Sequence, residues 1–207
     1  MANNAKMKIV VLVSGRGTNL QAIIDAQQTK TIASRIIMVI SNKENVAALD
    51  RAEKANIPFQ VITSKGKSKD VYNKELLKSL QTLNPDLIVL AGYMKILPPS
   101  VINCFTNKII NIHPSLLPSF PGLKAQQQAL DFGVKITGCT VHFVDEGCDT
   151  GPIILQEYEK VHNNDSQKSL SLRLLKKEHA ALVQAIQLIE NNKVILQDRK
   201  TLLREEP

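Results

Sequence analysis

The sequence predicts an α/β protein with an open, mostly parallel, twisted sheet and helices on both faces. Continuous apolar runs rich in β-branched residues alternate with segments whose apolar residues recur at helical spacing. A glycine-containing loop, Ser14 to Asn19, follows the first apolar run, as expected where a buried parallel strand passes into a helix. Helix ends are indicated by two short segments, Asn-Ile-Pro at 56–58 and Asn-Pro-Asp at 84–86. Each segment lies where a predicted helix should end and the next predicted strand should begin. These three observations indicate consecutive βα units.

The first half of the chain alternates regularly. Ile9 to Val13 is typical of a strand buried on both faces, and Leu20, Ile23 and Ile24 share one face of the helix that follows. The segment Lys65 to Asp70 is expected to form an exposed, mobile loop. The predicted strands are 8–13, 36–40, 59–62 and 86–91, and the predicted helices are 19–26, 46–55 and 70–83.

The second half is less regular. Residues 113–122 cannot form regular structure, because Pro114, Pro118 and Pro121 each lack a backbone donor, and loops of this length tend to be functional. The tail from Arg199 is expected to be frayed. The predicted strands are 108–112, 137–144, 152–158 and 193–196, and the predicted helices are 123–132 and 167–190.

Composition narrows the class of protein. With 207 residues, of which 43% are hydrophobic and 22% charged, the chain can bury one full-sized core. Its 26 Lys plus Arg against 19 Asp plus Glu give a net charge of +7, which suits nucleic acid, an acidic membrane or a polyanionic small substrate. The absence of Trp and the scarcity of other aromatic residues count against single-strand nucleic-acid binding.

Cysteine usage and the N-terminal sequence indicate a compartment. The three cysteines, Cys104, Cys139 and Cys148, include no Cys-x-x-Cys pair, so neither a disulfide framework nor a zinc site is predicted. The apolar run Ile9 to Val13 is too short for a secretion signal or a membrane span. We therefore expect the protein in the reducing cytoplasm, without a membrane partner.

The loop Ser14 to Asn19 is a candidate anion site. Backbone N–H groups at the start of a helix attract phosphate, and glycine lets a ligand approach the backbone closely. The loop is not a dinucleotide fingerprint, because Leu20 occupies the third glycine position and Ser41-Asn42 stands where an acidic residue would bind ribose. It is not a P-loop either, since no Gly-Lys-Ser/Thr follows. A plain strand-to-helix turn remains the alternative.

Asn111 and His113 are candidate catalytic residues. His113 follows the strand that ends at Ile112, at the carboxyl edge where open α/β sheets bind their ligands. Asn111 lies two residues earlier and therefore points to the same side. An imidazole and a carboxamide in these positions can both donate to an oxygen that becomes negative, as acyl transfer requires. The alternative is a histidine bound to loop backbone before a proline.

The acidic loop Asp145 to Thr150 supplies a third candidate. Asp149, if it lies near an imidazole, favours the charged ring, which is the better acid and oxyanion partner. The charges of Asp145 and Glu146 are interpreted as those of a solvated turn. Cys148 is not interpreted as a nucleophile, because no histidine-oriented cysteine pattern surrounds it.

Three blocks of the sequence resemble one known family. The blocks are Asn111 to Pro118 with Phe-Pro-Gly at 120–122, Gly138 to Val144, and Asp149 to Ile153. Together they resemble the formyltransferases that use 10-formyltetrahydrofolate, over the chain from Lys8 to about Leu196. The resemblance implies a Rossmann-like formyltransferase fold and a single domain over 1–207. Its N-terminal half, to about residue 100, would bind phosphate, and its C-terminal half would bind folate and carry the catalytic residues.

The resemblance also implies substrates and site residues. The substrates would be 10-formyltetrahydrofolate, as co-substrate, and glycinamide ribonucleotide, with no nucleic acid bound. No metal is expected, because the four histidines lack the spacing of metal ligands. The implied catalytic residues are Asn111, His113 and Asp149, and the implied substrate-binding residues are Gly17, Thr18, Asn19 and Glu178. The implied folate-binding residues are Lys69, Met94, Lys95, Ile96, Leu97, Asn111, Asp145, Glu146, Gly147, Cys148 and Asp149.

Two positions depart from the common pattern of the family. Lys95 stands where an arginine is frequent, and Lys69 falls where an arginine can meet the folate. At both positions the compact ammonium group of lysine replaces the planar guanidinium group of arginine. Recognition of the pterin by backbone groups should survive, whereas a bidentate side-chain contact to the folate is not expected.

The predicted reaction is acyl transfer from N10 of the folate to a primary amine, with His113 and Asn111 holding the tetrahedral oxygen. Two other members of the family are alternatives. A methionyl-tRNA formyltransferase needs a further C-terminal domain and a formyltetrahydrofolate deformylase usually has an extra N-terminal one, and we expect room for neither. A non-catalytic module that binds nucleic acid, suggested by the basic charge, is the alternative from another class. The oligomeric state is not predicted.

Overall fold

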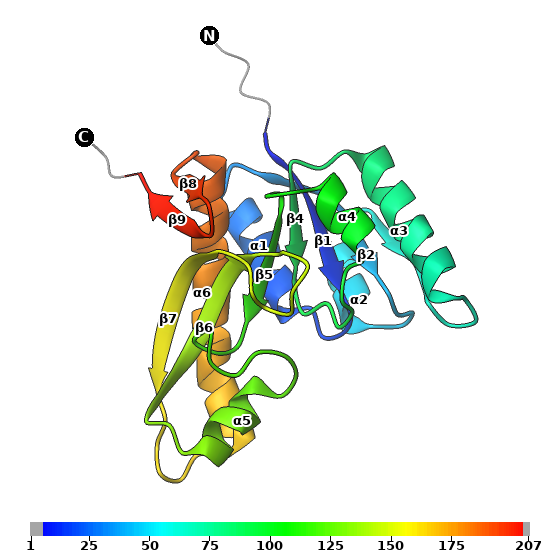
Figure 1. Cartoon of the computed structure of the whole chain (residues 1–207). Helices are drawn as coiled ribbons and strands as arrows, with labels where there is room; N and C mark the ends of the chain where they lie inside the picture. Colours follow the sequence, from blue (N-terminus) through cyan, green and yellow to red (C-terminus); the bar gives the residue numbers. More distant parts are fainter. Residues whose placement is uncertain (1–5, 205–207) are drawn as a thin grey trace. The chain divides into compact units, whose positions relative to one another are not determined.

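The computed structural model describes residues 6–204, in two compact units divided between Ile110 and Asn111. Figure 1 labels the helices and strands of both units except β3. The strands of the main sheet follow the order β3-β2-β1-β4-β5-β6-β7, and β8 pairs with β9. Pairing is parallel for β1 with β2, β1 with β4 and β2 with β3, and antiparallel for β6 with β7. The predicted α/β class with a mostly parallel sheet is confirmed.

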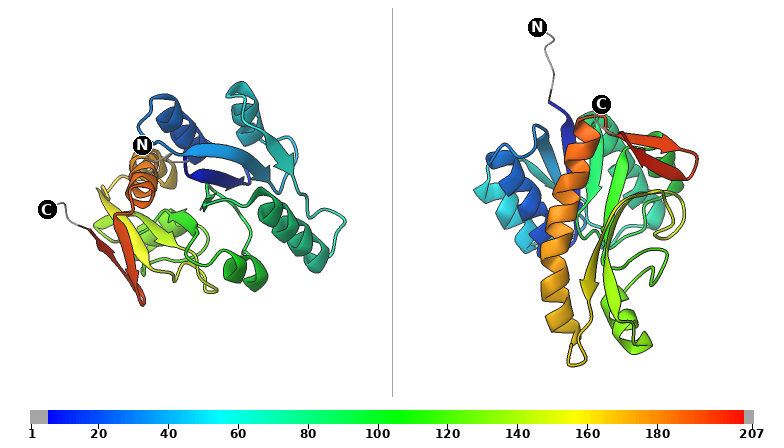
Figure 2. Two further views of the ribbon diagram at one scale, coloured as in Figure 1. Left: turned by 90° about the horizontal axis from the view of Figure 1, so that it is seen from above. Right: turned by 90° about the vertical axis from the view of Figure 1, so that its left-hand side faces the viewer.

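The first unit is a layered α/β structure. β1 lies between β2 and β4, and Ile9 to Val13 have no exposed surface, which explains the unbroken apolar run. Helices α1 and α2 cover one face of this sheet and α3 and α4 cover the other (Figure 2). The elements are β1 (Lys8–Val13), α1 (Thr18–Gln28), β2 (Arg35–Ser41), α2 (Ala47–Lys54), β3 (Phe59–Val61), α3 (Lys69–Leu83), β4 (Leu87–Leu90), α4 (Pro99–Cys104) and the start of β5 (Ile109–His113).

Two helices of the first unit differ from the prediction. α4 was not predicted, because a helix of 6 residues that begins at Pro99 is too short to show helical periodicity. α3 begins at Lys69, inside the segment 65–70 that was predicted to be a loop. The Ser68 side chain caps this helix by accepting a hydrogen bond from the Val71 N–H, and that cap sets the start.

The second unit combines a pair of antiparallel strands with a long helix. In the β6–β7 pair Gly138 lies opposite Tyr158. A Cβ at Gly138 would lie 2.1 Å from the Glu157 carbonyl oxygen, so a side chain has no room there. α6 packs on both strands through its apolar face. The elements are the end of β5, α5 (Ala125–Phe132), β6 (Ile136–Phe143), β7 (Ile153–Lys160), α6 (Gln167–Glu190), β8 (Val194–Gln197) and β9 (Lys200–Leu203).

The prediction that the tail frays from Arg199 is wrong for residues 199–204, and residues 205–207 lie outside the described residues. Lys200 to Leu203 form β9, which runs antiparallel to β8 in the hairpin drawn at the red end of Figure 1. The Thr201 hydroxyl donates to the Ile153 carbonyl, and the Arg199 guanidinium donates to the Thr150 carbonyl at 2.8 Å. The sequence does not show this strand, because four partly exposed residues carry too little apolar alternation.

Candidate active site

β5 presents two polar side chains on one side of its carboxyl end. Asn111 and His113 alternate with Ile112, which lies in the core. His113 is itself buried, with 4% of its surface exposed. A buried imidazole needs a partner for each ring nitrogen, and the second unit supplies both.

His113 lies between a carboxylate and a carbonyl group. Its Nδ1 is 3.2 Å from Oδ2 of Asp149, and its Nε2 is 2.9 Å from the carbonyl oxygen of Phe120. Both partners accept hydrogen bonds, so both ring nitrogens are satisfied only when each carries a hydrogen. A ring that carries a hydrogen on each nitrogen can donate to a developing oxyanion.

Asp149 connects the polar groups of the site. Its Oδ1 accepts a hydrogen bond from Nδ2 of Asn111 at 3.3 Å, and its Oδ2 accepts one from the Gly122 N–H at 2.8 Å. Burial by itself would raise the pKa of the Asp149 carboxyl. Hydrogen bonds from His142 and Gly122 and the charges of His113 and His142 outweigh burial and lower that pKa to about 2. Asp149 is therefore a carboxylate at neutral pH.

His142 is a site residue that the sequence analysis missed. Its Nδ1 donates to the Phe143 carbonyl at 2.8 Å, and its Nε2 lies 3.3 Å from Nδ2 of Asn111 and 3.6 Å from Oδ1 of Asp149. Because Nδ1 carries a hydrogen, Nε2 accepts from the Asn111 amide in the neutral ring and donates toward Asp149 in the charged ring. A signal was available, since a histidine inside a buried strand needs polar partners, but the histidines were compared only with metal-ligand spacings.

The proline-rich loop after β5 is held by Thr140. The Thr140 hydroxyl donates to the Ser115 carbonyl at 2.7 Å and accepts from the Leu117 N–H at 3.0 Å, and both groups are buried. Further along the loop, Phe120 has a φ of 54°, in the left-handed region that bulky residues rarely adopt. In this conformation the Phe120 carbonyl accepts the hydrogen bond from His113.

Asp145 orders the loop that carries Asp149. Its Oδ1 accepts hydrogen bonds from the Gly147 N–H at 3.1 Å and from the Thr150 hydroxyl at 2.6 Å. Asp145 therefore lies in a partly exposed turn, as interpreted, and its carboxylate also orders that turn, whereas Glu146 is exposed. The sequence could not show this role, because it depends on a turn that brings residues 145 and 150 together.

Cys139 and Cys148 of the second unit lie near candidate residues, and both thiols are weak nucleophiles. Burial and the adjacent Asp149 charge raise the pKa of the Cys148 thiol. Burial and the charges of Glu178 and Glu157 raise the pKa of the Cys139 thiol to about 12. Glu178 lies on α6 and is 8% exposed. Because its charge raises the pKa of the Cys139 thiol, Glu178 lies close to Cys139 of β6.

The glycine loop of the first unit leads into a helix start that no side chain caps. Gly17 is the N-cap of α1, with φ 69°, and its carbonyl accepts a hydrogen bond from the Gln21 N–H at 2.9 Å. A Cβ at Gly17 would lie 2.7 Å from the Cα of Ala48, so this position requires glycine for both its φ and its packing. Thr18 and Asn19 form the first turn, whose N–H groups and dipole suit an anion.

The segment Met94 to Leu97 follows β4 in the first unit. The Met94 N–H donates to the Ser14 hydroxyl at 2.7 Å, which fixes the backbone at this point. Leu97 is buried, so it supports the segment from the core side, whereas Met94 and Ile96 are exposed. An anchored backbone with exposed apolar side chains suits a flat heterocycle.

The two lysines that are expected to meet the folate, Lys95 and Lys69, lie differently. Lys95 has its Nζ 4.8 Å from the centre of the Tyr72 ring, a cation–π contact that needs no guanidinium fork. The Tyr72 hydroxyl shares a short hydrogen bond with the Tyr93 hydroxyl, which holds the ring in place. Lys69 is the exposed first residue of α3. The structure therefore gives Lys95 a defined position and leaves the Lys69 side chain at the surface.

No group of three or more His, Cys, Asp or Glu among residues 6–204 could hold a metal ion. No helix in this range is long and apolar enough to cross a membrane.

Comparison of the sequence with known proteins identifies its relatives. Residues 7–186 match the family model described as formyl transferase. The chain is 43% identical to the trifunctional purine biosynthetic protein adenosine-3 of Drosophila melanogaster over 95% of its own length, which is 15% of that protein. It is also 43% identical to the phosphoribosylglycinamide formyltransferase of Escherichia coli, over 84% of this chain and 82% of that protein. The chain thus spans less than a fifth of the trifunctional relative.

Two solved structures share the fold. Glycinamide ribonucleotide transformylase 1 from Symbiobacterium toebii has a TM-score of 0.94 at 41% identity, covering 97% of this chain and 95% of that one. A formyltetrahydrofolate deformylase from Pseudomonas syringae has a TM-score of 0.92 at 30% identity, covering 97% of this chain and 67% of that one. Proteins named for different reactions therefore share this fold, and the reaction has to be argued from the site.

Proposed function

Because this chain belongs to the formyl transferase family, we propose that it transfers the formyl group of 10-formyltetrahydrofolate to the amine of glycinamide ribonucleotide. The products are formylglycinamide ribonucleotide and tetrahydrofolate, in purine biosynthesis. The observation that carries the proposal is the cluster of Asn111, His113 and Asp149, whose side chains lie within 3.3 Å of one another through Asp149. Such a cluster offers two donors to a developing oxyanion and a carboxylate to support them.

The chemistry follows from this geometry. The neutral amine of the substrate attacks the formyl carbon, and the carbonyl oxygen becomes negative in the tetrahedral adduct. His113 and Asn111 donate hydrogen bonds to this oxygen, while the Asp149 carboxylate, 3.2 Å from Nδ1, orients the imidazole. The bond from the formyl carbon to N10 then breaks, and the proton lost by the amine ends on N10. No covalent bond to the enzyme is required.

Substrate binding requires His113 to exchange one hydrogen-bond acceptor, the Phe120 carbonyl, for another. Its carbonyl accepts from Nε2 of His113, the nitrogen that remains after Asp149 has taken Nδ1. The formyl oxygen must therefore replace the Phe120 carbonyl as the acceptor. The left-handed conformation of a phenylalanine costs about 1 to 3 kcal/mol, so release of Phe120 offsets part of the lost hydrogen bond.

The remaining site residues receive roles within the same proposal. Gly17, Thr18 and Asn19 hold the substrate phosphate through backbone N–H groups, and Glu178 contacts the glycinamide part. The pterin is bound by Met94 to Leu97 and by the loop 145–149. Lys69 and Lys95 meet the anionic part of the folate. The partners are small molecules, and we place the reaction in the cytoplasm, in agreement with three free cysteines.

The test is an assay with purified protein and both substrates, followed through the absorbance of released tetrahydrofolate. We expect release only when glycinamide ribonucleotide is present. Release at an equal rate without it would identify a deformylase, the reaction named for the Pseudomonas syringae structure. Silence in both conditions, together with a salt-sensitive shift of polynucleotide in a gel, would favour the nucleic-acid module.

A further inference from the structure

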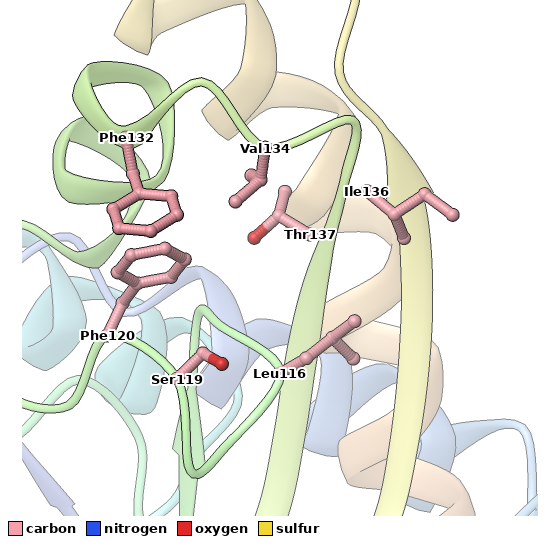
Figure 3. A pocket seen from close by; sticks show the side chains of 7 residues that line it. All are labelled: Leu116, Ser119, Phe120, Phe132, Val134, Ile136 and Thr137. Atoms are coloured by element: carbon pink, nitrogen blue, oxygen red, sulfur yellow. The ribbon is translucent and has the colours of Figure 1, made fainter.

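We propose that the second unit carries an additional ligand site, which takes a neutral aromatic molecule of one or two rings with a single hydrogen-bonding group. The site is a cavity of about 340 Å³ between the loop after β5, the end of α5 and the start of β6 (Figure 3). Its lining contains none of the residues to which we assign substrate or folate contacts. Binding at this cavity does not depend on the proposed function.

The hydroxyl of Thr137 is the first observation. Thr137 is 2% exposed, and its Oγ1 is buried without a hydrogen-bond partner among residues 6–204. Figure 3 shows this oxygen on the side of Thr137 that faces the two phenyl rings of the cavity. A buried hydroxyl without a partner destabilises the fold, and proteins usually satisfy such groups. A ligand that exchanges a hydrogen bond with Thr137 supplies the missing partner.

The walls of the cavity are the second observation. The Phe120 and Phe132 rings meet edge to face, with centroids 5.8 Å apart and an interplanar angle of 64°. Phe132 is 79% exposed and Ile136 is 52% exposed, so apolar surface surrounds the mouth of the cavity. Contiguous exposed apolar side chains mark binding surfaces. No lining residue is charged, and an ionised ligand would lose its hydration here without compensation.

The size of the cavity limits the ligand. A cavity of about 150 Å³ is known to hold benzene, and small-molecule sites begin at about 300 Å³. The volume of about 340 Å³ therefore suits one or two fused rings. The Thr137 oxygen is shielded from solvent, so a ligand reaches it only when a lining side chain moves.

Phe120 connects the cavity with His113. Its ring lines the cavity, and its carbonyl accepts the hydrogen bond from Nε2 of His113 at 2.9 Å. The ring can rotate about its Cα–Cβ bond without moving the carbonyl, but a ligand that shifts the Phe120 backbone from its φ of 54° also turns the carbonyl. Occupation of the cavity that moves this backbone therefore changes the surroundings of His113.

Equilibrium dialysis of the full chain against 2-naphthol and naphthalene tests the site. The two probes have the same rings, and only 2-naphthol has a hydroxyl. We expect 2-naphthol to bind at least fivefold more tightly, and Thr137→Val to remove this preference while naphthalene binds as before. Val134→Phe narrows the cavity and should weaken both probes at least tenfold. Val71→Phe, at an exposed valine of α3, is the matched control and should change neither.

Three results would overturn the proposal. They are no binding of 2-naphthol at millimolar concentration, equal binding of the two probes, or binding that Val134→Phe leaves intact. Thermal unfolding checks the premise: Thr137→Val should melt at the same or a higher temperature, and a lower one would mean that the hydroxyl has a partner. In protein with ¹³C-labelled histidine, saturation with 2-naphthol should shift the His113 ring signal, and an unshifted signal would refute the connection through Phe120.

Discussion

The cluster around Asp149 in the second unit and the glycine loop in the first are built in opposite ways. In the cluster every polar contact involves a side chain whose charge can change, namely His113, His142 and Asp149. In the loop the groups offered to a ligand are backbone N–H groups at a helix start that no side chain caps. The cluster should therefore respond to pH and to changes of functional group, whereas the loop should respond to changes of backbone shape.

The largest expected effect is in the cluster. His113→Ala and Asn111→Ala should each lower turnover at least a hundredfold, because loss of one oxyanion donor costs about 2.7 to 4 kcal/mol of transition-state stabilisation. Substrate affinity should change little. Single-turnover measurements would check this, and near-normal turnover of His113→Ala would exclude the proposed mechanism.

Gly17→Ala tests the backbone conformation of the glycine loop, because the substitution adds a methyl group and changes no polar group. The new Cβ would lie 2.7 Å from Ala48 at a φ of 69°, so we expect a loss of about 1 to 3 kcal/mol in the free energy of unfolding. The KM for the phosphate-bearing substrate should also rise. Urea denaturation and steady-state kinetics measure the two effects. Gly15→Ala is the control, because a Cβ at Gly15 meets nothing within 4 Å, and equal losses in both variants would contradict the packing argument.

His142→Leu tests the residue that the sequence analysis missed. The substitution removes a partner of the Asn111 amide and of the Asp149 carboxylate. We expect turnover to fall about tenfold, equivalent to about 1.4 kcal/mol, with a shifted pH profile. His162→Leu, at an exposed histidine, should leave both unchanged. A variant with a normal pH profile would show that His142 only fills space.

Acid unfolding tests the charge of Asp149. Its pKa of about 2 in the folded protein lies below the ordinary value of 3.8, so the carboxylate stabilises the fold. This contribution, at most about 2 kcal/mol, is fully present above pH 4 and is lost as pH falls toward 2. The free energy of unfolding of the native protein minus that of Asp149→Asn should therefore shrink between pH 4 and 2. The subtraction removes the effect of Asp165, whose pKa the Arg173 guanidinium also lowers. A constant difference would contradict the assignment.

The smallest expected effect belongs to the C-terminal hairpin. Arg199 donates to the Thr150 carbonyl and lies 3.9 Å from Asp145, in the loop that carries Asp149. Its side chain is largely exposed, so Arg199→Ala should raise the KM for the folate less than about threefold. Lys200→Ala serves as the neighbouring control. A change in KM of tenfold or more would mean that the hairpin is part of the binding site.

The local order of the chain could be predicted because it depends on residues close in sequence. The buried strand 8–13 shows itself as an apolar run, and α6 agrees with the predicted 167–190 at both ends, because helical spacing and a Ser166 cap are local signals. The residue types that could act on a carbonyl, Asn111 and His113 at a strand end, were visible for the same reason. Their assignment as catalytic residues stays a prediction.

What the sequence alone determined is thus the α/β class, most helices and strands, and the family. Tertiary structure decided which groups meet. Asp149 accepts hydrogen bonds from Asn111 and Gly122, which lie at least 27 residues away in sequence. His142 contacts Asp149 only because of where β6 lies in the fold. β9 forms only because β8 offers its edge. Contacts of this kind depend on the distance between chain segments in the folded protein, and periodicity and spacing do not record that distance.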